Sequence, residues 1–353
     1  MIADLVSTII PVHNRARLLM EAVASVVAQS HRPIEIIVVD DGSTDDTPQA
    51  IGAIAARHPQ IVRALHQSNA GPGRARQRGL DAARGAFVQF LDSDDLLLPR
   101  KLELQVAALR ANPECGAAYG KTRSYRIGET PRDVPLKRTG EKIDAMFPAH
   151  LGSRWWSTST PLYRHALLQR IGPWTDLRNE EDWEYECRLA AAGTRLSFCP
   201  AFVSDTRYHA DEHLGGFARP CVERIRDRAE ARRLIYASAQ RAGLGANLPE
   251  MQHFARGLFH LSRQCGAAGH ARQAQALFEL ARAASTQERA GSLEFRVYAG
   301  AAELLGWCAA GQLAACLDRW REASRPPARA DGVSLEGAPA RDRPTGLAQD
   351  QAR

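Results

Sequence analysis

The first 110 residues alternate between short apolar runs rich in β-branched residues and longer stretches with apolar residues at helical spacing. The run over 34–39 is nearly continuous in Ile and Val, as expected for a strand covered on both faces. Repeated units of this kind predict an α/β fold with a mainly parallel, twisted sheet flanked by helices. The expected strands lie at 5–10, 34–39, 61–66 and 86–91, and the expected helices at 18–27, 47–57, 72–83 and 99–110.

The pattern changes beyond these units. One more strand is expected at 119–127, followed by a polar connection to about residue 142. From about residue 219 the chain is rich in Ala, Arg, Leu and Gln at helical spacing, which predicts two or more helical hairpins. The residues after 323 have little apolar content and are expected to be disordered. We therefore predict an α/β domain over 1–215, a helical C-terminal region over 216–323 and a tail over 324–353.

Composition argues against several classes of protein. No stretch approaches the roughly 20 consecutive apolar residues of a membrane span. The N-terminus lacks the basic start and apolar core of a signal peptide, so we expect a cytoplasmic protein. The net charge is +6, but the basic residues are spread along the chain and no nucleic-acid motif is present, so we expect no nucleic-acid partner. This charge permits peripheral association with the inner face of a membrane.

Three carboxylates follow the strand expected at 86–91. Asp92 and Asp94 are two residues apart, so an extended loop can aim both side chains at one cation. Negative charges this close need water, a metal ion or hydrogen-bond donors to compensate them. A hard divalent ion with oxygen ligands is one solution, and it leaves positions for phosphate oxygens. The alternative is a solvated acidic turn. Asp95 is expected to be a loop or cap residue.

Polar loops also follow the first two expected strands. Pro11, His13 and Asn14 follow the first, and Asp40 and Asp41 follow the second. Carboxylates there can accept hydrogen bonds from a nucleobase or ribose, although helix capping is the alternative reading. Because such sheets bind ligands beyond the carboxyl ends of their strands, these loops are candidates for one site.

The loop before the helix at 72–83 combines Asn69 with glycines and arginines. Gly71 and Gly73 let backbone amides approach a ligand, and the helix N-terminus favours anions. Arg74 and Arg76 offer charge-assisted hydrogen bonds to phosphate or to the carboxylates of neighbouring loops. A loop with solvated arginines is the alternative.

Taken together and in order, these loops resemble glycosyltransferase family 2, an inverting family with the GT-A fold. The matching stretches are 7–14, 35–45, 69–79 and 90–95, and they cover about residues 4–110 in the family's order and spacing. Two positions depart from the family's pattern. The family commonly has Tyr where this chain has His13, so base stacking is expected to differ. It commonly has Asn where this chain has Gln77, which is a mild change.

The resemblance implies metal-dependent, inverting transfer of a sugar from a nucleotide-sugar, expected to be a UDP-sugar, to a hydroxyl on a glycan or lipid-linked acceptor. It places this activity in polysaccharide, lipopolysaccharide or other glycoconjugate synthesis. It implies that Mn²⁺ or Mg²⁺ lies at Asp92 and Asp94, and that the 1–215 domain is catalytic. The donor-binding residues that it implies are Pro11, His13, Asn14, Asp40, Asp41, Asn69, Arg76, Asp92 and Ser93.

A later region supports the resemblance through the stretches 157–164, 171–174 and 179–189. There Asp182 matches the family's catalytic base, which takes the proton from the acceptor hydroxyl. Without the resemblance, residues 180–182 are an acidic first turn that complements a helix dipole. His209 matches, more loosely, a histidine that approaches the metal or the diphosphate, and a structural histidine is the alternative.

Other features leave alternatives open. The arginines over 224–233 predict either a helix packed on the catalytic domain with a solvated basic face, or a membrane-surface helix that docks a lipid-diphosphate acceptor. The alternatives to an enzyme are a nucleotide-sugar-binding protein without catalysis and a scaffold that acts through its helical C-terminus. Four tryptophans either stack on a sugar or fill the core: Trp155, Trp156, Trp174 and Trp183.

Overall fold

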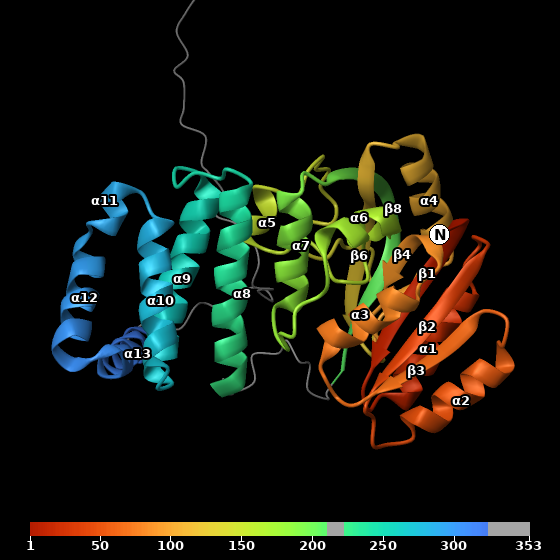
Figure 1. Cartoon of the computed structure of the whole chain (residues 1–353), viewed down its shortest axis with the longest axis horizontal. Helices are drawn as coiled ribbons and strands as arrows, with labels where there is room; N and C mark the ends of the chain where they lie inside the picture. Colours follow the sequence, from red (N-terminus) through yellow and green to blue (C-terminus); the bar gives the residue numbers. More distant parts are fainter. Residues whose placement is uncertain (210–221, 324–353) are drawn as a thin grey trace, which may run out of the picture.

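The computed structural model describes residues 1–209 and 222–323, and it is organised around one eight-stranded sheet. The sheet lies at one end of the molecule, helices α8 to α13 stack at the other end, and α7 lies between them (Figure 1). The strand order is β3-β2-β1-β4-β7-β6-β8-β5. The strands are β1 Ile2–Val12, β2 Ile34–Asp41, β3 Val62–Gln67, β4 Gly85–Phe90, β5 Leu96–Leu97, β6 Cys115–Arg126, β7 Leu162–Arg164 and β8 Arg195–Tyr208.

The first four strands form the parallel part of the sheet, as predicted. β1 pairs with β2 and with β4, and β2 pairs with β3, all in parallel register. β2 is buried along its whole length, which accounts for its unbroken Ile and Val run. The helix predicted from Pro99 begins two residues later, because Pro99 lies in the preceding turn. The helices of this part are α1 Ala16–Val27, α2 Thr47–Arg57, α3 Pro72–Ala82 and α4 Lys101–Ala111.

The other part of the sheet mixes strand directions, and the sequence predicted it only in part. β7 is antiparallel to β4 and β6, and β8 is parallel to β6. The long strand β8 was not predicted. Its pairing passes from Cys199 to Phe202, so Pro200 and the residue after it bulge out of the ladder. Proline has no amide hydrogen for a ladder, and such a bulge interrupts the alternation that reveals a strand in a sequence.

Three of the four candidate tryptophans belong to the core. Trp155, Trp156 and Trp174 are buried. Trp174 stacks on Tyr185 of α7, with ring centroids 4.0 Å apart. These three rings are therefore unavailable as an exposed sugar platform.

The C-terminal region is helical, as predicted, and it shares a hydrophobic core with the first part of the chain. Phe254 and Phe259 of α9 join one cluster with Leu151 of α5 and Cys187 of α7. The predicted boundary near residue 215 and the predicted tail lie outside the described residues. The remaining helices are α5 Ala149–Gly152, α6 His165–Ile171, α7 Glu181–Ala191, α8 Val222–Arg241, α9 Pro249–Ala267, α10 Ala271–Ala283, α11 Gln287–Ala290, α12 Leu293–Leu305 and α13 Trp307–Ala323.

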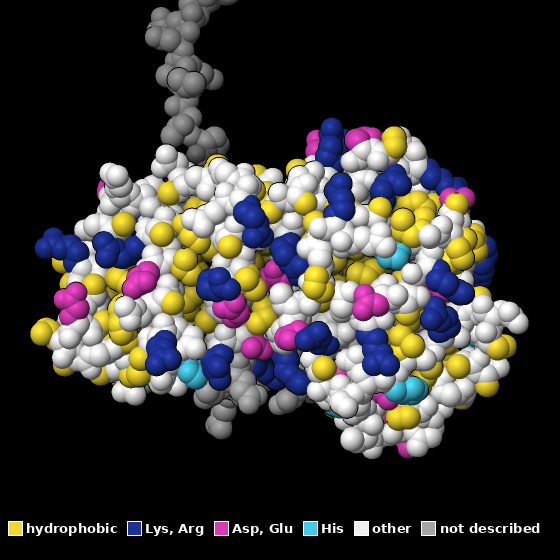
Figure 2. Space-filling model, in the orientation of Figure 1, with side chains coloured by type: hydrophobic (Ala, Val, Ile, Leu, Met, Phe, Trp, Pro, Cys, Tyr) yellow, Lys and Arg dark blue, Asp and Glu magenta, His cyan; other side chains and the backbone are white. Residues whose placement is uncertain are grey.

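The arginine-rich segment is part of α8, and this helix packs on α7. Arg228 and Arg232 form ion pairs with Glu180, so the packed-helix alternative is the one observed. Figure 2 shows Lys and Arg side chains scattered over the visible face among acidic and apolar ones. None of the helices within residues 1–209 and 222–323 has the length and hydrophobicity that crossing a bilayer requires. Peripheral membrane association stays a prediction.

Candidate active site

A cleft of about 1260 Å³ is formed by the segments that follow β1, β2, β3 and β4, facing residues from 154–158, 178–182 and the end of β8. It brings together predicted site residues from across the first 209 residues. The only predicted site residue outside its lining is Asp40. Those that line it are Pro11, His13, Asn14, Asp41, Asn69, Arg76, Asp92, Ser93, Asp94, Asp182 and His209.

Asp41 organises the loop at one end of this cleft. Its Oδ1 accepts a hydrogen bond from the Ala70 amide at 2.7 Å, and its Oδ2 accepts one from the Gly71 amide at 2.8 Å. Gly71 has φ 92°, a left-handed conformation in which a side chain would be strained. His13 Nδ1 lies 3.0 Å from the Asp41 carbonyl oxygen and 3.2 Å from Asn69 Nδ2. The loops after β1, β2 and β3 therefore form one connected surface.

The Asp40 carboxylate is turned into the loop below this surface. Its Oδ1 accepts the Ser43 amide at 3.0 Å, and its Oδ2 lies 3.2 Å from His66 Nδ1. Burial opposes ionisation, but the Ser43 and His66 contacts outweigh it and lower the pKa of Asp40. Of the two neighbouring aspartates, Asp41 is thus the one that a ligand in the cleft could meet. Asp40 holds the turn, which is the capping role that its sequence position also allowed.

Arg76 joins the two halves of the cleft. This arginine of α3 donates from Nη2 to Asp92 Oδ1 at 2.8 Å and from Nη1 to Glu181 Oε1 at 2.8 Å. Its guanidinium also lies 5.0 Å from the centroid of the Trp174 ring. Only 5% of its side chain is exposed, so both ion pairs are shielded from water. The arginine predicted to bind the donor is therefore also the connection between the Asp92 loop and α7.

Asp92, Asp94 and His209 were predicted to hold a metal ion, and their donor atoms fit a hard divalent cation. Asp94 Oδ2 lies 2.6 Å from Arg15 Nη1 and 3.1 Å from His209 Nε2, and the Asp92 side chain is 31% exposed to the cleft. Within the part of the chain that the structure describes, no group of three or more His, Cys, Asp or Glu side chains is placed to enclose a metal. A cation there would need further ligands, and the oxygens of a diphosphate are of the required kind.

Asp95 is a buried structural residue. Its Oδ2 accepts a hydrogen bond from Ser159 Oγ at 2.8 Å, and its Oδ1 accepts the Arg207 amide at 3.1 Å. Burial, reinforced by the charges of Asp94 and Asp92, raises its pKa well above the usual range. Asp95 ties the loop after β4 to β8 and to the segment before β7, in agreement with its predicted loop role.

Asp182 lies in the first turn of α7, where the Glu-Asp pair opens a helix as predicted. Its Oδ2 pairs with Arg154 Nη1 and lies 3.4 Å from Thr158 Oγ1. Arg154 is in turn held by Glu186, through Nε at 2.9 Å and Nη2 at 2.6 Å. The Asp182 carboxylate is thus fixed at the wall of the cleft by a buried arginine.

The acidic pair Glu181 and Asp182 titrates unequally. Burial raises the pKa of Glu181 to about 7, and the charge of Asp182 adds to this effect. Burial acts on Asp182 in the same direction, but the positive charges of Arg154 and Arg76 outweigh it and lower the pKa of Asp182. Asp182 is therefore the member of the pair that is ionised at neutral pH and free to accept a proton.

Sequence reasoning missed several cations of the cleft. Arg15 directly follows the loop containing His13 and Asn14, so its position was a usable signal. Arg154 lies in the irregular stretch after residue 126, where no periodicity points to it. Arg178 donates to Asn69 Oδ1 at 2.8 Å, a contact between residues 109 positions apart that no local pattern reveals.

Comparison with known proteins agrees with this arrangement. A profile of the family described as Glycosyl transferase family 2 matches residues 7–168. Residues 7–168 are therefore similar to glycosyl transferase family 2. An uncharacterized glycosyltransferase of Nostoc sp. is 40% identical over 204 residues, which cover 56% of this chain and 60% of that protein. The chain spans only about a quarter of the length of the Rickettsia relatives that it also matches.

Solved structures show the same fold over a larger part of the chain. Staphylococcus aureus TarS 1–349 in complex with UDP-GlcNAc superposes with a TM-score of 0.65 at 21% identity, covering 90% of this chain and 92% of that one. The mannosyltransferase PcManGT of Pyrobaculum calidifontis, in complex with GDP-Man and Mn²⁺, gives a TM-score of 0.50 at 22% identity, covering 90% and 87%. The predicted GT-A fold, with its helical C-terminal region, is confirmed.

Proposed function

We propose that this protein is an inverting glycosyltransferase that moves a sugar from a UDP-sugar to a hydroxyl group of a glycan or lipid-linked acceptor in glycoconjugate synthesis. The observation that carries the proposal is that one cleft contains the donor-binding motif residues and the ionised Asp182, with Arg76 between them. The UDP-GlcNAc complex of TarS, which has the same fold, supports a UDP-linked donor.

The loops after β1, β2 and β3 would hold the nucleotide. Asp41 and Asn69 lie where they can accept hydrogen bonds from a base or ribose, and His13 offers a flat ring beside them. The Asp92–Asp94 loop, with Arg15 and Arg76 on its carboxylates, would face the diphosphate. Arginine side chains suit this position because they bind phosphate oxygens through charge-assisted hydrogen bonds.

A divalent cation, Mn²⁺ or Mg²⁺, held by Asp92, Asp94 and His209, would stabilise the negative charge that develops on the departing nucleoside diphosphate. The Mn²⁺ in the complex of PcManGT supports this assignment.

Asp182 would act as the general base. Its carboxylate takes the proton from the acceptor hydroxyl while the hydroxyl oxygen bonds to the anomeric carbon and the bond to the diphosphate breaks, which inverts that carbon. Arg154 keeps Asp182 ionised and fixes its orientation through Glu186. The base needs no large pKa shift, because it must only be unprotonated when the acceptor arrives.

Turnover of nucleotide-sugars by the purified full chain tests this proposal. UDP-GlcNAc, UDP-glucose, UDP-galactose and GDP-mannose are supplied with and without Mn²⁺, and the release of nucleoside diphosphate is measured. We expect metal-dependent turnover with a UDP-sugar, and a loss of about 10²–10⁴-fold in Asp182→Asn. The matched control is Asp176→Asn, because Asp176 is an exposed carboxylate outside the cleft.

Two results would contradict the proposal. Turnover that is unchanged in Asp182→Asn would remove Asp182 as the base. Calorimetric binding of UDP and Mn²⁺ without turnover of any donor would favour a nucleotide-sugar-binding protein without catalysis.

A further inference from the structure

Helix α8 lies outside the residues that match the family profile. It forms ion pairs with the segment that leads into α7. Glu180 receives hydrogen bonds from Arg228 Nε at 3.1 Å, from Arg232 Nε at 2.9 Å and from Arg232 Nη2 at 3.2 Å. The side chains of Glu180 and Arg232 are 16% and 14% exposed, so this contact is largely shielded from water. Removing Arg232 from this contact would leave the Glu180 charge largely shielded from water, which costs more than breaking an exposed pair.

Glu180 is also conformationally unusual. It has φ 59° and ψ 16°, the left-handed region that residues other than glycine rarely adopt. Its carbonyl oxygen accepts the first backbone hydrogen bond of α7, from the Glu184 amide at 3.0 Å. A strained residue of this kind persists only where the surrounding structure holds it. Because Glu180 directly precedes Glu181 and Asp182, its backbone conformation sets the direction in which the Asp182 side chain points from the helix.

Arg232 also contacts the residue that follows Asp182. The guanidinium of Arg232 lies 4.0 Å from the centroid of the Trp183 ring. Trp183 donates from its amide to Asp182 Oδ1 at 2.7 Å and from its ring nitrogen to the His150 carbonyl at 2.7 Å. Arg232 therefore contacts both sequence neighbours of the Glu181–Asp182 pair.

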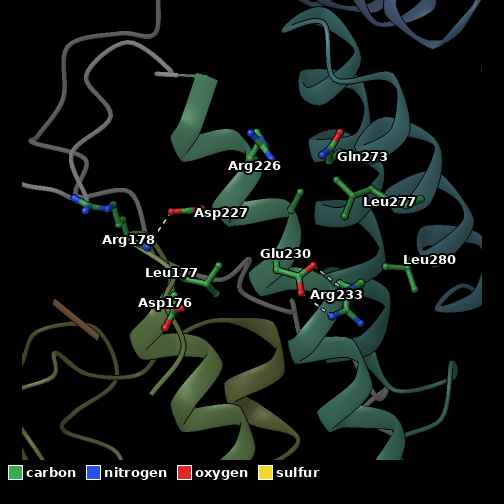
Figure 3. A pocket seen from close by; sticks show the side chains of 12 residues that line it. Asp176, Leu177, Arg178, Arg226, Asp227, Glu230, Arg233, Gln273, Leu277 and Leu280 are labelled. Carbon is green, nitrogen blue, oxygen red and sulfur yellow. Dashed lines mark hydrogen bonds and ion pairs between the residues drawn. The ribbon is translucent and has the colours of Figure 1, made fainter. Parts of the chain in front are cut away.

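A second contact of α8 points to the donor side. Asp227 Oδ2 accepts the Arg178 amide at 2.9 Å (Figure 3). The Arg178 side chain in turn donates to Asn69 Oδ1 at 2.8 Å. The hollow of about 720 Å³ beside this contact carries three arginines and three carboxylates, so its charge favours no ionic ligand and we assign none to it. Helix α8 thus touches the 176–182 segment at two points, one near each half of the active site.

We infer that Arg232, together with Arg228, is a positioning residue for the transfer reaction: by holding Glu180 in its left-handed conformation, it places Asp182 against the acceptor hydroxyl. This inference rests on the proposed function. It gives the helical C-terminal region a part in the chemistry of the cleft, in place of a separate scaffolding role.

The variant Arg232→Gln tests this role, with Arg233→Gln as the matched control. Arg233 is the next residue of α8, but its side chain is 52% exposed and pairs with Glu230 on the same helix at 2.6 Å (Figure 3). Two readouts are used on the full chain. Hydrogen exchange of the amides over 178–186 reports the order of the segment without any need for activity, and steady-state kinetics separate kcat from the KM for the donor.

We expect faster exchange over 180–184 in Arg232→Gln and a kcat at least about 10-fold lower, with the donor KM unchanged, because a small misplacement of a catalytic group costs this much or more. Arg232→Lys keeps one charged contact and should recover part of kcat. Should Arg232→Gln fail to fold, Glu180→Gln removes the charge pairing while leaving Arg232 on the Trp183 ring, and it is judged by the same readouts.

Exchange and kcat that match those of Arg233→Gln would overturn the inference. A wild-type protein without turnover would contradict the proposed function instead, and the exchange experiment would still decide whether Arg232 orders the segment.

Discussion

Replacing Arg76 by Met tests the connection between the two halves of the cleft. The guanidinium of Arg76 bridges Asp92 and Glu181 with two contacts of 2.8 Å. Methionine is unbranched and adaptable, so it fills much of the same space without the charge. The main effect of Arg76→Met is therefore to leave two carboxylates without their common cation.

The expected loss follows from how buried each partner is. Removing one member of a buried ion pair costs about 3–5 kcal/mol, because the other charge stays behind in a poor solvent. The Glu181 side chain is 8% exposed and bears this cost, whereas water can reach Asp92 and reduce its share. We therefore expect the free energy of unfolding to fall by about 3 kcal/mol at pH 8.

The loss should depend on pH. Burial raises the pKa of Glu181 to about 7. A carboxyl group whose pKa is raised in the folded state contributes stability that is fully present below its unfolded pKa and is lost as pH rises through the folded value. Without Arg76 the folded pKa of Glu181 rises further. At pH 5 the buried group is protonated at little cost, whereas at pH 8 the folded state must either bury its charge or bind a proton that the unfolded state has released. The loss in Arg76→Met should thus be clearly smaller at pH 5.

Urea unfolding followed by circular dichroism at both pH values measures this effect. Arg74→Met is the control, because Arg74 pairs with Asp176 at the surface, and such pairs are worth about 0–1 kcal/mol. A loss below about 1 kcal/mol at pH 8, similar to the control, would refute the argument from burial. An equal loss at pH 5 and pH 8 would refute the assignment of the effect to Glu181.

Three further predictions concern the metal, the packing and the nucleotide loop. In Asp94→Asn, Mn²⁺ should no longer increase the thermal shift that UDP produces in the wild-type protein; an undiminished Mn²⁺ effect would remove Asp94 from the metal site. Gly79→Ala should lower the free energy of unfolding by about 1–3 kcal/mol, because the new Cβ would lie 2.3 Å from Cγ2 of Ile9. Gly52→Ala is the control and should not lower it, because no atom lies within 4 Å of its Cβ position. Equal free energies for the two variants in urea unfolding would contradict this prediction. Asp41→Asn should raise the donor KM more than it lowers kcat, because the Ala70 and Gly71 amides lose a charged acceptor, and a change confined to kcat would argue against a binding role.

The half of the cleft formed by the loops after β1 to β4 was predictable because it depends on local patterns. Strands that are buried on both faces are visible as apolar runs, and in a parallel sheet their carboxyl ends meet at one edge. Polar residues directly after such runs, such as Asp41 and Asp92, therefore had to lie near one another. The order of these loops along the chain then carried the family resemblance.

The other half was less predictable, because its residues act through contacts between distant segments. Strand β8 carries a bulge at Pro200 that hides its alternation, and Arg154 lies in a stretch without periodicity. Asp40 and Asp41 are equivalent in the sequence, and only the folded loop shows that one faces the cleft and the other holds the turn.

The sequence by itself determined the α/β fold, the loops that border the cleft and the helical nature of the C-terminal region, because each of these follows from periodicity over a few residues. Only the tertiary structure decided how the charges are paired. Arg76 and Glu181 are 105 positions apart, and Glu180 and Arg232 are 52 apart. Such pairs form because burial of one charge requires an opposite charge from whichever segment the fold brings beside it.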